Sequence, residues 1–175
     1  MDLITVIVPC FNEEASLPYF FSAFEQLKKA MSSVAFELLF VDDGSKDSTL
    51  SIIKQLAVEH DEVEYISFSR NFGKEAAMYA GLRHARGDYV VFMDADLQDP
   101  PSLLPDMYKA VSEEGYDSAA TRRVTRAGEP PIRSLFARLF YRLMNRISRT
   151  ELVDGARDYR LMNRKFVNAL LELAE

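Results

Sequence analysis

Short apolar runs alternate along the chain with longer segments whose apolar residues recur at helical spacing. The runs rich in β-branched and aromatic residues predict buried strands at residues 3–8, 36–41, 63–68 and 89–93. The helical spacing predicts helices at residues 17–31 behind a Ser16 cap, 50–57 after Ser48, 76–85, 103–114 and 164–173. Because strands and helices alternate at short intervals, we predict an α/β, Rossmann-like fold with a mainly parallel sheet flanked by helices.

A polar cluster follows each predicted strand. The clusters are Pro-Cys-Phe-Asn-Glu at 9–13, Asp-Asp-Gly-Ser at 42–45, Arg-Asn-Phe-Gly-Lys at 70–74 and Asp-Ala-Asp at 94–96. Ligands of open α/β sheets bind beyond the carboxyl ends of the strands, where these four clusters would converge. The sequence therefore predicts one binding site at that edge of the sheet.

The Asp94-Ala95-Asp96 cluster is the strongest candidate for a metal site. Its two carboxylates can reach one cation if the backbone leaves strand geometry there, and Gln98 adds a neutral oxygen. Oxygen ligands shared between protein and phosphates suit Mg²⁺ or Mn²⁺. An Asp-x-Asp pair can also be a solvated turn before a proline, but the buried strand that leads straight into Asp94 favours the metal interpretation.

The other polar residues permit two interpretations each. Asp42 or Asp43 can accept a hydrogen bond from a nucleobase or a ribose hydroxyl, although this segment could simply cap the next helix. Lys74 opens a helix, where it suits a diphosphate, but it also fits an exposed surface lysine. Asp158 is flanked by two arginines, and a salt bridge is its simpler interpretation.

Composition narrows the function classes. The 175 residues fit one ordinary domain, and a single cysteine and two distant histidines argue against a disulfide framework or a His/Cys metal cage. We find no signal peptide and no apolar stretch of about 18 residues that could span a membrane. The absence of a Walker A loop and of G-x-G-x-x-G disfavours P-loop kinases and dinucleotide-binding enzymes.

The charge is distributed unevenly. The chain has a net charge of −6, yet residues 122–149 hold eight arginines and one acid, which gives that segment +7 and the remainder −13. Such a pattern indicates a local anionic partner and not a nucleic acid. Within the segment, residues 132–147 predict a basic amphipathic helix, which would lie on a membrane surface or pack on the sheet or a second subunit.

Taken together, these motifs resemble glycosyltransferase family 2 with the GT-A fold. The resemblance extends to its polyprenyl-phosphate glycosyltransferase branch, which includes dolichol-phosphate mannosyltransferases and undecaprenyl-phosphate glucosyltransferases. The matching stretches cover nearly the whole chain in family order: 6–13, 42–49, 70–74, 87–88, 93–101 and 158–162.

The resemblance implies roles for individual residues. The nucleotide sugar would be held by Pro9, Phe11, Glu13 and Asp42, with Asp43 and Ala95 nearby, and Lys74 would approach the diphosphate. Mg²⁺ or Mn²⁺ would be bound by Asp94, Asp96 and Gln98. Arg122 and Arg126 would contact phosphate or acceptor, and Asp96 and Asp158 would be catalytic. Family members often carry tyrosine at the position of Phe11, so a hydroxyl contact would be lost here. Asp158 would orient groups, because an ionised lipid phosphate needs little help from a general base.

The activity that the resemblance implies is inverting transfer of a hexose, with UDP-glucose as the expected donor and a polyprenyl phosphate as the acceptor. The metal would neutralise the leaving group while a phosphate oxygen attacks the anomeric carbon from the opposite face. The alternatives are a GDP-mannose-dependent mannosyltransferase, transfer to a saccharide, an Asp-x-Asp phosphatase, and a membrane-associated nucleotide-binding module without activity.

We also predict how the chain is organised. Residues 1–128 would form the nucleotide-sugar and metal core, and residues 129–175 an acceptor-side segment continuous with it. Proteins of this branch usually continue into membrane helices, so we expect a piece of an enzyme that works at the cytoplasmic face of a membrane. The oligomeric state stays open, a homo-oligomer included.

Overall fold

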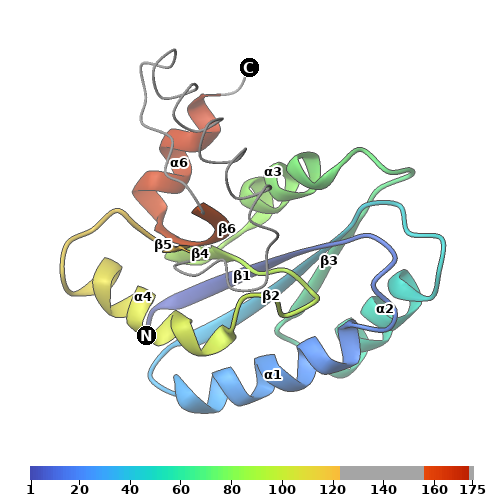
Figure 1. Ribbon diagram of the computed structural model, residues 1–175, viewed down its shortest axis with the longest axis horizontal. Coiled ribbons are helices and arrows are strands. Elements are labelled where there is room, and N and C mark those ends of the chain that lie inside the picture. Colours follow the sequence, from blue (N-terminus) through green and yellow to red (C-terminus); the bar gives the residue numbers. More distant parts are fainter. Residues whose placement is uncertain (123–155, 174–175) are drawn as a thin grey trace, which may run out of the picture. The chain divides into compact units, whose positions relative to one another are not determined.

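The computed structural model describes residues 1–122 and 156–173 and contains one six-stranded sheet (Figure 1). Its strands are β1 (Leu3–Cys10), β2 (Ala35–Asp42), β3 (Val63–Ser67), β4 (Tyr89–Phe92), β5 (Ser118–Arg122) and β6 (Ala156–Asn163), in the order β3-β2-β1-β4-β6-β5. β1 pairs in parallel with β2 and β4, and β2 with β3, whereas β6 runs antiparallel to β4. The prediction of an α/β fold with a mainly parallel sheet is confirmed.

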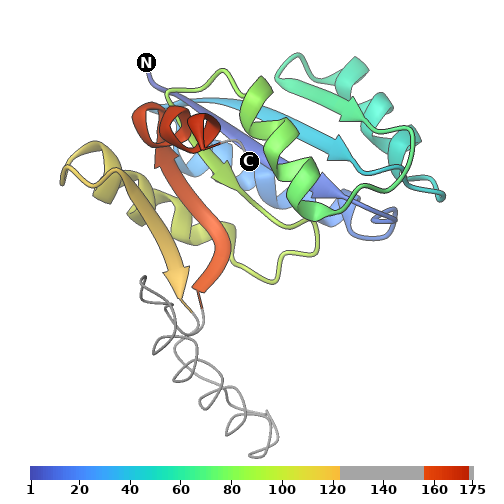
Figure 2. The ribbon, with the colours of Figure 1, turned by 90° about the horizontal axis from the view of Figure 1, so that it is seen from above.

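Helices cover both faces of the sheet. They are α1 (Leu17–Ala30), α2 (Thr49–Glu59), α3 (Lys74–His84), α4 (Leu104–Ser112), which follows a 3₁₀ turn at Pro101–Leu103, and α6 (Arg164–Glu172). Figure 2 shows helices on both sides of the sheet. Alternate residues of β1 point to opposite faces: Val6 and Val8 pack with α1, α2 and α4, and Ile7 packs with α3 and α6. A β-carbon on Gly81 would lie 2.4 Å from a methyl carbon of Ile7, so glycine lets α3 sit directly on β1.

The contacts divide the chain into two units. The first comprises residues 1–119 and 159–175, and the second residues 120–158. The boundary that we predict at residue 128 lies outside the described residues, as do Arg126 and the amphipathic helix at 132–147. These three stay predictions.

The predicted Ser16 cap is wrong. Ser16 and Ser48 stand at the N-cap positions of α1 and α2, but neither side chain accepts a hydrogen bond from its helix. At the start of α2 the carboxylate of Asp47 accepts instead from the backbone N–H of Thr49 at 3.0 Å. At the start of α6 the side chain of Asn163 accepts from the backbone N–H of Phe166. The pattern also fails to predict β5 and β6, which are rich in polar and arginine residues.

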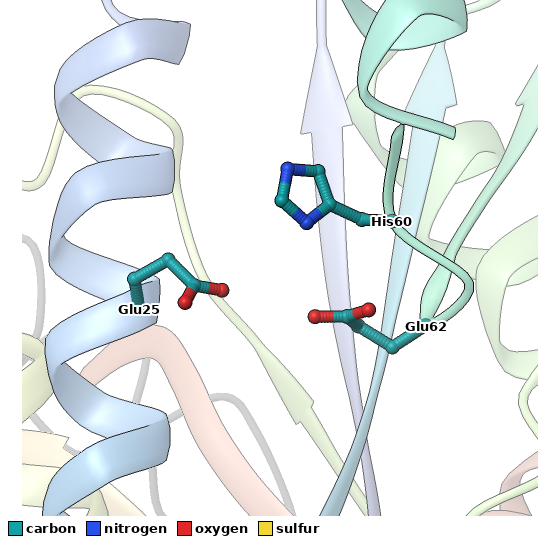
Figure 3. Close-up of side chains that lie close together, drawn as sticks. All are labelled: Glu25, His60 and Glu62. Carbon is teal, nitrogen blue, oxygen red and sulfur yellow. The ribbon is translucent and has the colours of Figure 1, made fainter. Parts of the chain in front are cut away.

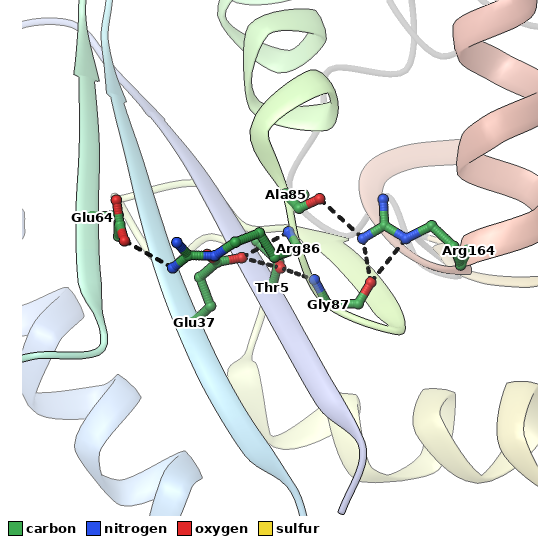
Figure 4. Close-up of polar contacts among 7 residues, drawn as sticks. All are labelled: Thr5, Glu37, Glu64, Ala85, Arg86, Gly87 and Arg164. Atoms are coloured by element: carbon green, nitrogen blue, oxygen red, sulfur yellow. Dashed lines mark hydrogen bonds and ion pairs between the residues drawn. The ribbon is translucent and has the colours of Figure 1, made fainter.

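A polar network fastens the amino-terminal ends of β1 and β2 to the connection between α3 and β4 (Figure 4). The buried carboxylate of Glu37 accepts from the Thr5 hydroxyl, from the Arg86 backbone at 3.0 Å and from the Arg86 guanidinium at 2.7 Å. The Thr5 hydroxyl accepts in turn from the backbone N–H of Gly87 at 2.8 Å. Arg164 donates to the carbonyls of Ala85 and Gly87 and so joins α6 to the same connection.

Candidate functional site

A cleft of about 320 Å³ lies beyond the carboxyl ends of β1 and β4. It is lined by residues from all four polar clusters of the sequence: Pro9, Cys10, Phe11, Glu13, Asp43, Asn71, Gly73, Lys74, Ala77, Asp94, Ala95 and Asp96. Eight of these were singled out from the sequence, and the structure brings them together. The other four, Cys10, Asn71, Gly73 and Ala77, have no role assigned from the sequence. All four lie within or beside the strand-end motifs, which is the signal that could have found them.

Hydrogen bonds lock the loop after β1 to the loop after β2. The Asn12 backbone donates to the Ser45 hydroxyl at 3.0 Å, and its side chain accepts from the backbone of Lys46 at 2.9 Å. The backbone of Glu13 donates to the Thr49 hydroxyl at 2.7 Å. Asn12 has a φ of 57°, a left-handed conformation that asparagine tolerates better than most residues. The first wall of the cleft is thus set before any ligand binds.

Asp42 and Asp43 have different surroundings although they are adjacent. The Asp42 carboxylate is 1% exposed and accepts from the Ser45 backbone at 3.2 Å and the Ser67 hydroxyl at 3.1 Å. Asp43 lines the cleft, and its carboxylate accepts from the backbone N–H groups of Phe72 and Gly73 at 2.7 and 2.9 Å. Asp42 therefore braces β2 against β3, and Asp43 fixes the loop that leads to Lys74.

The Asp94-Ala95-Asp96 turn forms the opposite wall. Ala95 is buried, which leaves Asp94 half-buried and Asp96 exposed toward the cleft. The Lys74 ammonium lies 2.7 Å from a carboxylate oxygen of Asp94. The Asp96 carboxylate accepts from the backbone and side-chain amides of Gln98 at 3.1 and 2.7 Å, although Gln98 does not line the cleft.

The same turn stores backbone strain. Leu97 has a φ of 56°, and its N–H donates to the carbonyl of Asp94 at 3.2 Å. A left-handed conformation costs a side chain such as leucine about 1–2 kcal/mol. Leu97 also packs against the hydrophobic core, which holds this conformation in place. The turn is therefore rigidly specified at the position where two carboxylates meet one cleft.

Aromatic and thiol groups complete the floor and the mouth of the cleft. The ring of Phe11 is 42% exposed at the mouth and is available for stacking. Cys10 is buried, and burial, reinforced by the nearby charges of Glu13 and Asp42, raises the pKa of its thiol well above the ordinary value. Cys10 is thus a neutral core thiol and not a nucleophile.

Three further residues with predicted roles are Arg122, Arg126 and Asp158. Arg122 ends β5 and Asp158 lies in β6, and both belong to the second unit of the chain. Arg126 lies outside the described residues. Their contacts with phosphate or acceptor stay predictions.

Comparison with known proteins identifies the family. The sequence model described as Glycosyl transferase family 2 matches residues 5–171. The chain belongs to glycosyl transferase family 2. It is 45% identical over 175 residues to CsbB of Bacillus subtilis strain 168, named as a candidate glycosyltransferase, and the match covers 99% of this chain and 52% of that protein.

Further relatives of the family 2 chain carry a more specific name. It is 40% identical over 175 residues to the prophage bactoprenol glucosyl transferase homolog of Escherichia coli K12, covering 98% of this chain and 56% of that protein. The bactoprenol glucosyl transferase of Shigella phage SfV is 39% identical over 172 residues, with 98% and 55% covered. The chain thus spans about half the length of the curated relatives it matches.

Solved structures confirm the predicted GT-A fold. The family 2 chain superposes on mannosyl-3-phosphoglycerate synthase from Rubrobacter xylanophilus with a TM-score of 0.69 at 22% identity, covering 94% of this chain and 54% of that one. It superposes on a mannosyltransferase from Pyrobaculum calidifontis, solved with GDP-Man and Mn²⁺, with a TM-score of 0.65 at 23% identity, covering 95% and 46%.

A second group of potential metal ligands lies at the other end of the sheet. Glu25 of α1 approaches His60 and Glu62, which precede β3 (Figure 3). Lys28 already bridges the two carboxylates, at 2.7 Å from Glu25 and in direct contact with Glu62. Because β3 is parallel to β2 and β1, this group faces away from the cleft, and Lys28 provides its positive charge. It is an ion-pair cluster of the family 2 chain and not part of the cleft.

None of the described helices of the family 2 chain is both long enough and apolar enough to span a lipid bilayer.

Proposed function

We propose that this family 2 chain is the catalytic part of an inverting glycosyltransferase that moves glucose from UDP-glucose to a polyprenyl phosphate. The observation that carries the proposal is the meeting of Asp94, Asp96 and Lys74 in one cleft at the carboxyl edge of the sheet. Two carboxylates and one ammonium there match the needs of a metal-bound diphosphate.

The acidic pair fits a divalent cation. Both side chains line the cleft, Asp96 is exposed, and Asp94 attracts a cationic group across the cleft. Asp94 and Asp96 would hold Mg²⁺ or Mn²⁺, with Gln98 joining if its amide turns its oxygen inward. When bound, the cation would offset the negative charge that the diphosphate leaving group develops. Mn²⁺ accompanies the nucleotide sugar in the Pyrobaculum mannosyltransferase, which supports this assignment.

The remaining cleft residues would bind the nucleoside. Pro9 and Phe11 present apolar surface at the mouth, where a base can stack. Glu13 lies on the same wall, and a hydrogen bond to the Thr49 hydroxyl fixes its backbone. Its carboxylate would accept a hydrogen bond from a base or a ribose hydroxyl. Asp42 would contribute through the loop it braces, since its carboxylate is buried on Ser45 and Ser67.

The acceptor assignment rests on the relatives. Two of them are named as bactoprenol glucosyl transferases or a homolog of one, which supports a polyprenyl phosphate acceptor and glucose as the sugar. We propose the cytoplasmic face of the membrane as the place of the reaction. An ionised phosphate is already a nucleophile, so Asp158 would position groups without accepting a proton. Arg122 and Arg126 would contact the acceptor phosphate, and the basic segment 132–147, which the sequence predicts to be helical, would rest on anionic headgroups.

A transfer assay tests the proposal. Membranes from cells expressing the gene for this chain should convert UDP-[¹⁴C]glucose and undecaprenyl phosphate into a label that extracts into organic solvent. The conversion should need Mg²⁺ or Mn²⁺ and should stop on chelation. Label transferred only from GDP-mannose would assign the mannosyltransferase alternative, and label transferred only to a soluble saccharide would overturn the lipid acceptor. If no label is transferred from any nucleotide sugar, the transferase proposal is wrong, and the alternative of a nucleotide-binding module without activity stands.

A further inference from the structure

Lys74 ties the two walls of the cleft together. It is the first residue of α3, and the residue before it, Gly73, is fixed by the hydrogen bond from its N–H to Asp43. From this point its ammonium reaches a carboxylate oxygen of Asp94 at 2.7 Å. The ion pair joins the segment after β3 to the turn after β4, two strands that β2 and β1 separate in the sheet.

The ion pair is exchangeable. The side chains of Lys74 and Asp94 are 40% and 37% exposed. Exposed and half-exposed ion pairs contribute little to stability, because water screens the attraction and holding two side chains together costs entropy. Lys74 can therefore leave Asp94 for a better anion without disturbing the fold.

A divalent cation and the Lys74 ammonium compete for the same carboxylate. The ammonium already lies 2.7 Å from one carboxylate oxygen of Asp94, and two cations side by side in a cleft repel each other. A metal ion at Asp94 and Asp96 must therefore release Lys74. The ammonium, still anchored at the start of α3, then needs a new anion within reach, and a nucleoside diphosphate supplies one.

We propose that Lys74 couples metal binding to nucleotide binding: it holds Asp94 until a divalent cation arrives and then transfers to the diphosphate. The inference rests on the proposed function of the cleft and adds the order in which Lys74 changes its partner. Lys74 opposes metal binding when nucleotide is absent and supports nucleotide binding when metal is present. By linkage, each ligand then raises the affinity for the other by the same factor.

The test replaces Lys74 by methionine, which keeps the length of the side chain and removes its charge. Mn²⁺ affinity of the 175-residue chain is measured from the electron paramagnetic resonance signal of free Mn²⁺, without nucleotide. UDP affinity is measured by calorimetry at saturating Mn²⁺. We expect Lys74→Met to bind Mn²⁺ about two- to fivefold more tightly, and UDP at least about fivefold more weakly.

The controls separate this inference from the proposed function. Lys54→Met, an exposed lysine of α2, should change neither constant, and Lys74→Arg should restore the coupling. Weaker or unchanged Mn²⁺ binding by Lys74→Met would overturn the role of Lys74 and leave the metal site standing. If the parent chain binds no Mn²⁺ with or without UDP, the metal site itself is wrong, and the coupling falls with it.

Discussion

A β-carbon on Gly44 would lie 2.4 Å from the carbonyl carbon of Arg70, so the turn after β2 touches the turn after β3 backbone to backbone. Gly44 also has a φ of 70°, which side chains rarely adopt. These two turns carry Asp43 and Lys74 into the cleft. The close approach is therefore one of the contacts that shape the candidate site.

Gly44→Ala should deform this contact. The left-handed backbone alone costs about 1–2 kcal/mol with a side chain, and the clash with backbone atoms adds to it. We expect a loss of unfolding free energy above that range in urea, together with weaker UDP binding. Gly115→Ala is the matched control, since Gly115 has a φ of 83° but nothing within 4 Å of its added β-carbon. Equal losses of unfolding free energy in Gly44→Ala and Gly115→Ala would contradict the prediction, because they would show that the contact with Arg70 adds no cost.

Asp43 should act through the loop that it holds. Asp43→Ala would leave the N–H groups of Phe72 and Gly73 without their carboxylate. Two hydrogen bonds to a carboxylate are lost, but both donors are partly exposed and water can replace the acceptor in part, so we expect a loss of about 1 kcal/mol in unfolding free energy. UDP binding should weaken as well, because Lys74 follows directly. Asp61→Ala, at an exposed loop position, should do neither. A variant with unchanged stability would contradict the anchoring role of Asp43.

The strands and the site motifs could be predicted because their signals are local. Val6, Ile7 and Val8 form a β-branched run, and such runs specify buried parallel strands whatever lies beside them. β6 could not be recognised, because its pattern makes sense only beside β4: Leu161 packs in one core and Met162 in the other. The ion pair of Lys74 with Asp94 joins residues whose proximity only the folded sheet creates.

The side chains of Ser16 and Ser48 do not cap their helices for a related reason. Ser16 and Ser48 are good capping residues by type. In the structure, however, the backbone around them is held by other loops: the N–H of Ser48 donates to the side chain of Glu14 at 2.9 Å. Loop-to-loop hydrogen bonds of this kind depend on the tertiary arrangement, which the local sequence does not encode.

The polar network at the amino-terminal edge should stabilise the fold without serving the cleft. Thr5→Val removes the hydroxyl that donates to Glu37 and accepts from Gly87. We expect it to lower the unfolding free energy by about 1–3 kcal/mol, and to leave UDP affinity within about twofold. Thr5→Ser keeps the hydroxyl and should behave nearly as the parent does. A large loss of UDP affinity in a folded Thr5→Val protein would mean that this edge is coupled to the site.

The Lys28 cluster predicts a pH dependence. Burial alone would raise the pKa of Glu62, but the hydrogen bond and charge of Lys28 outweigh it and lower that pKa. Burial would likewise lower the pKa of Lys28, yet its bonds to Glu25 and Glu62 raise it. The pair therefore stabilises the folded state between the unfolded pKa values of about 4.3 and about 10.4.

Lys28→Met should accordingly lose stability at pH 7, by no more than about 1 kcal/mol because the pair is partly exposed. The difference from the parent should shrink as the pH falls through the lowered pKa of Glu62. Urea unfolding at pH 7, 5 and 3.5 measures this difference in unfolding free energy. The neighbouring variant Lys29→Met serves as the control. A difference that grows toward acidic pH would refute this account of the ion pair.

The central claim is that Asp94 and Asp96 bind a nucleotide sugar through a divalent cation, and calorimetric titration of UDP-glucose into the parent chain and Asp96→Asn tests it most directly. The parent should bind with Mn²⁺ and lose most of its affinity with EDTA. Asp96→Asn should bind at least about tenfold more weakly with Mn²⁺, a loss of about 1.4 kcal/mol, while its melting temperature stays unchanged. The control Asp61→Asn, at an exposed turn position, should keep the affinity and the melting temperature of the parent. Equal binding by Asp96→Asn and the parent, with Mn²⁺ and with EDTA alike, would contradict the claim.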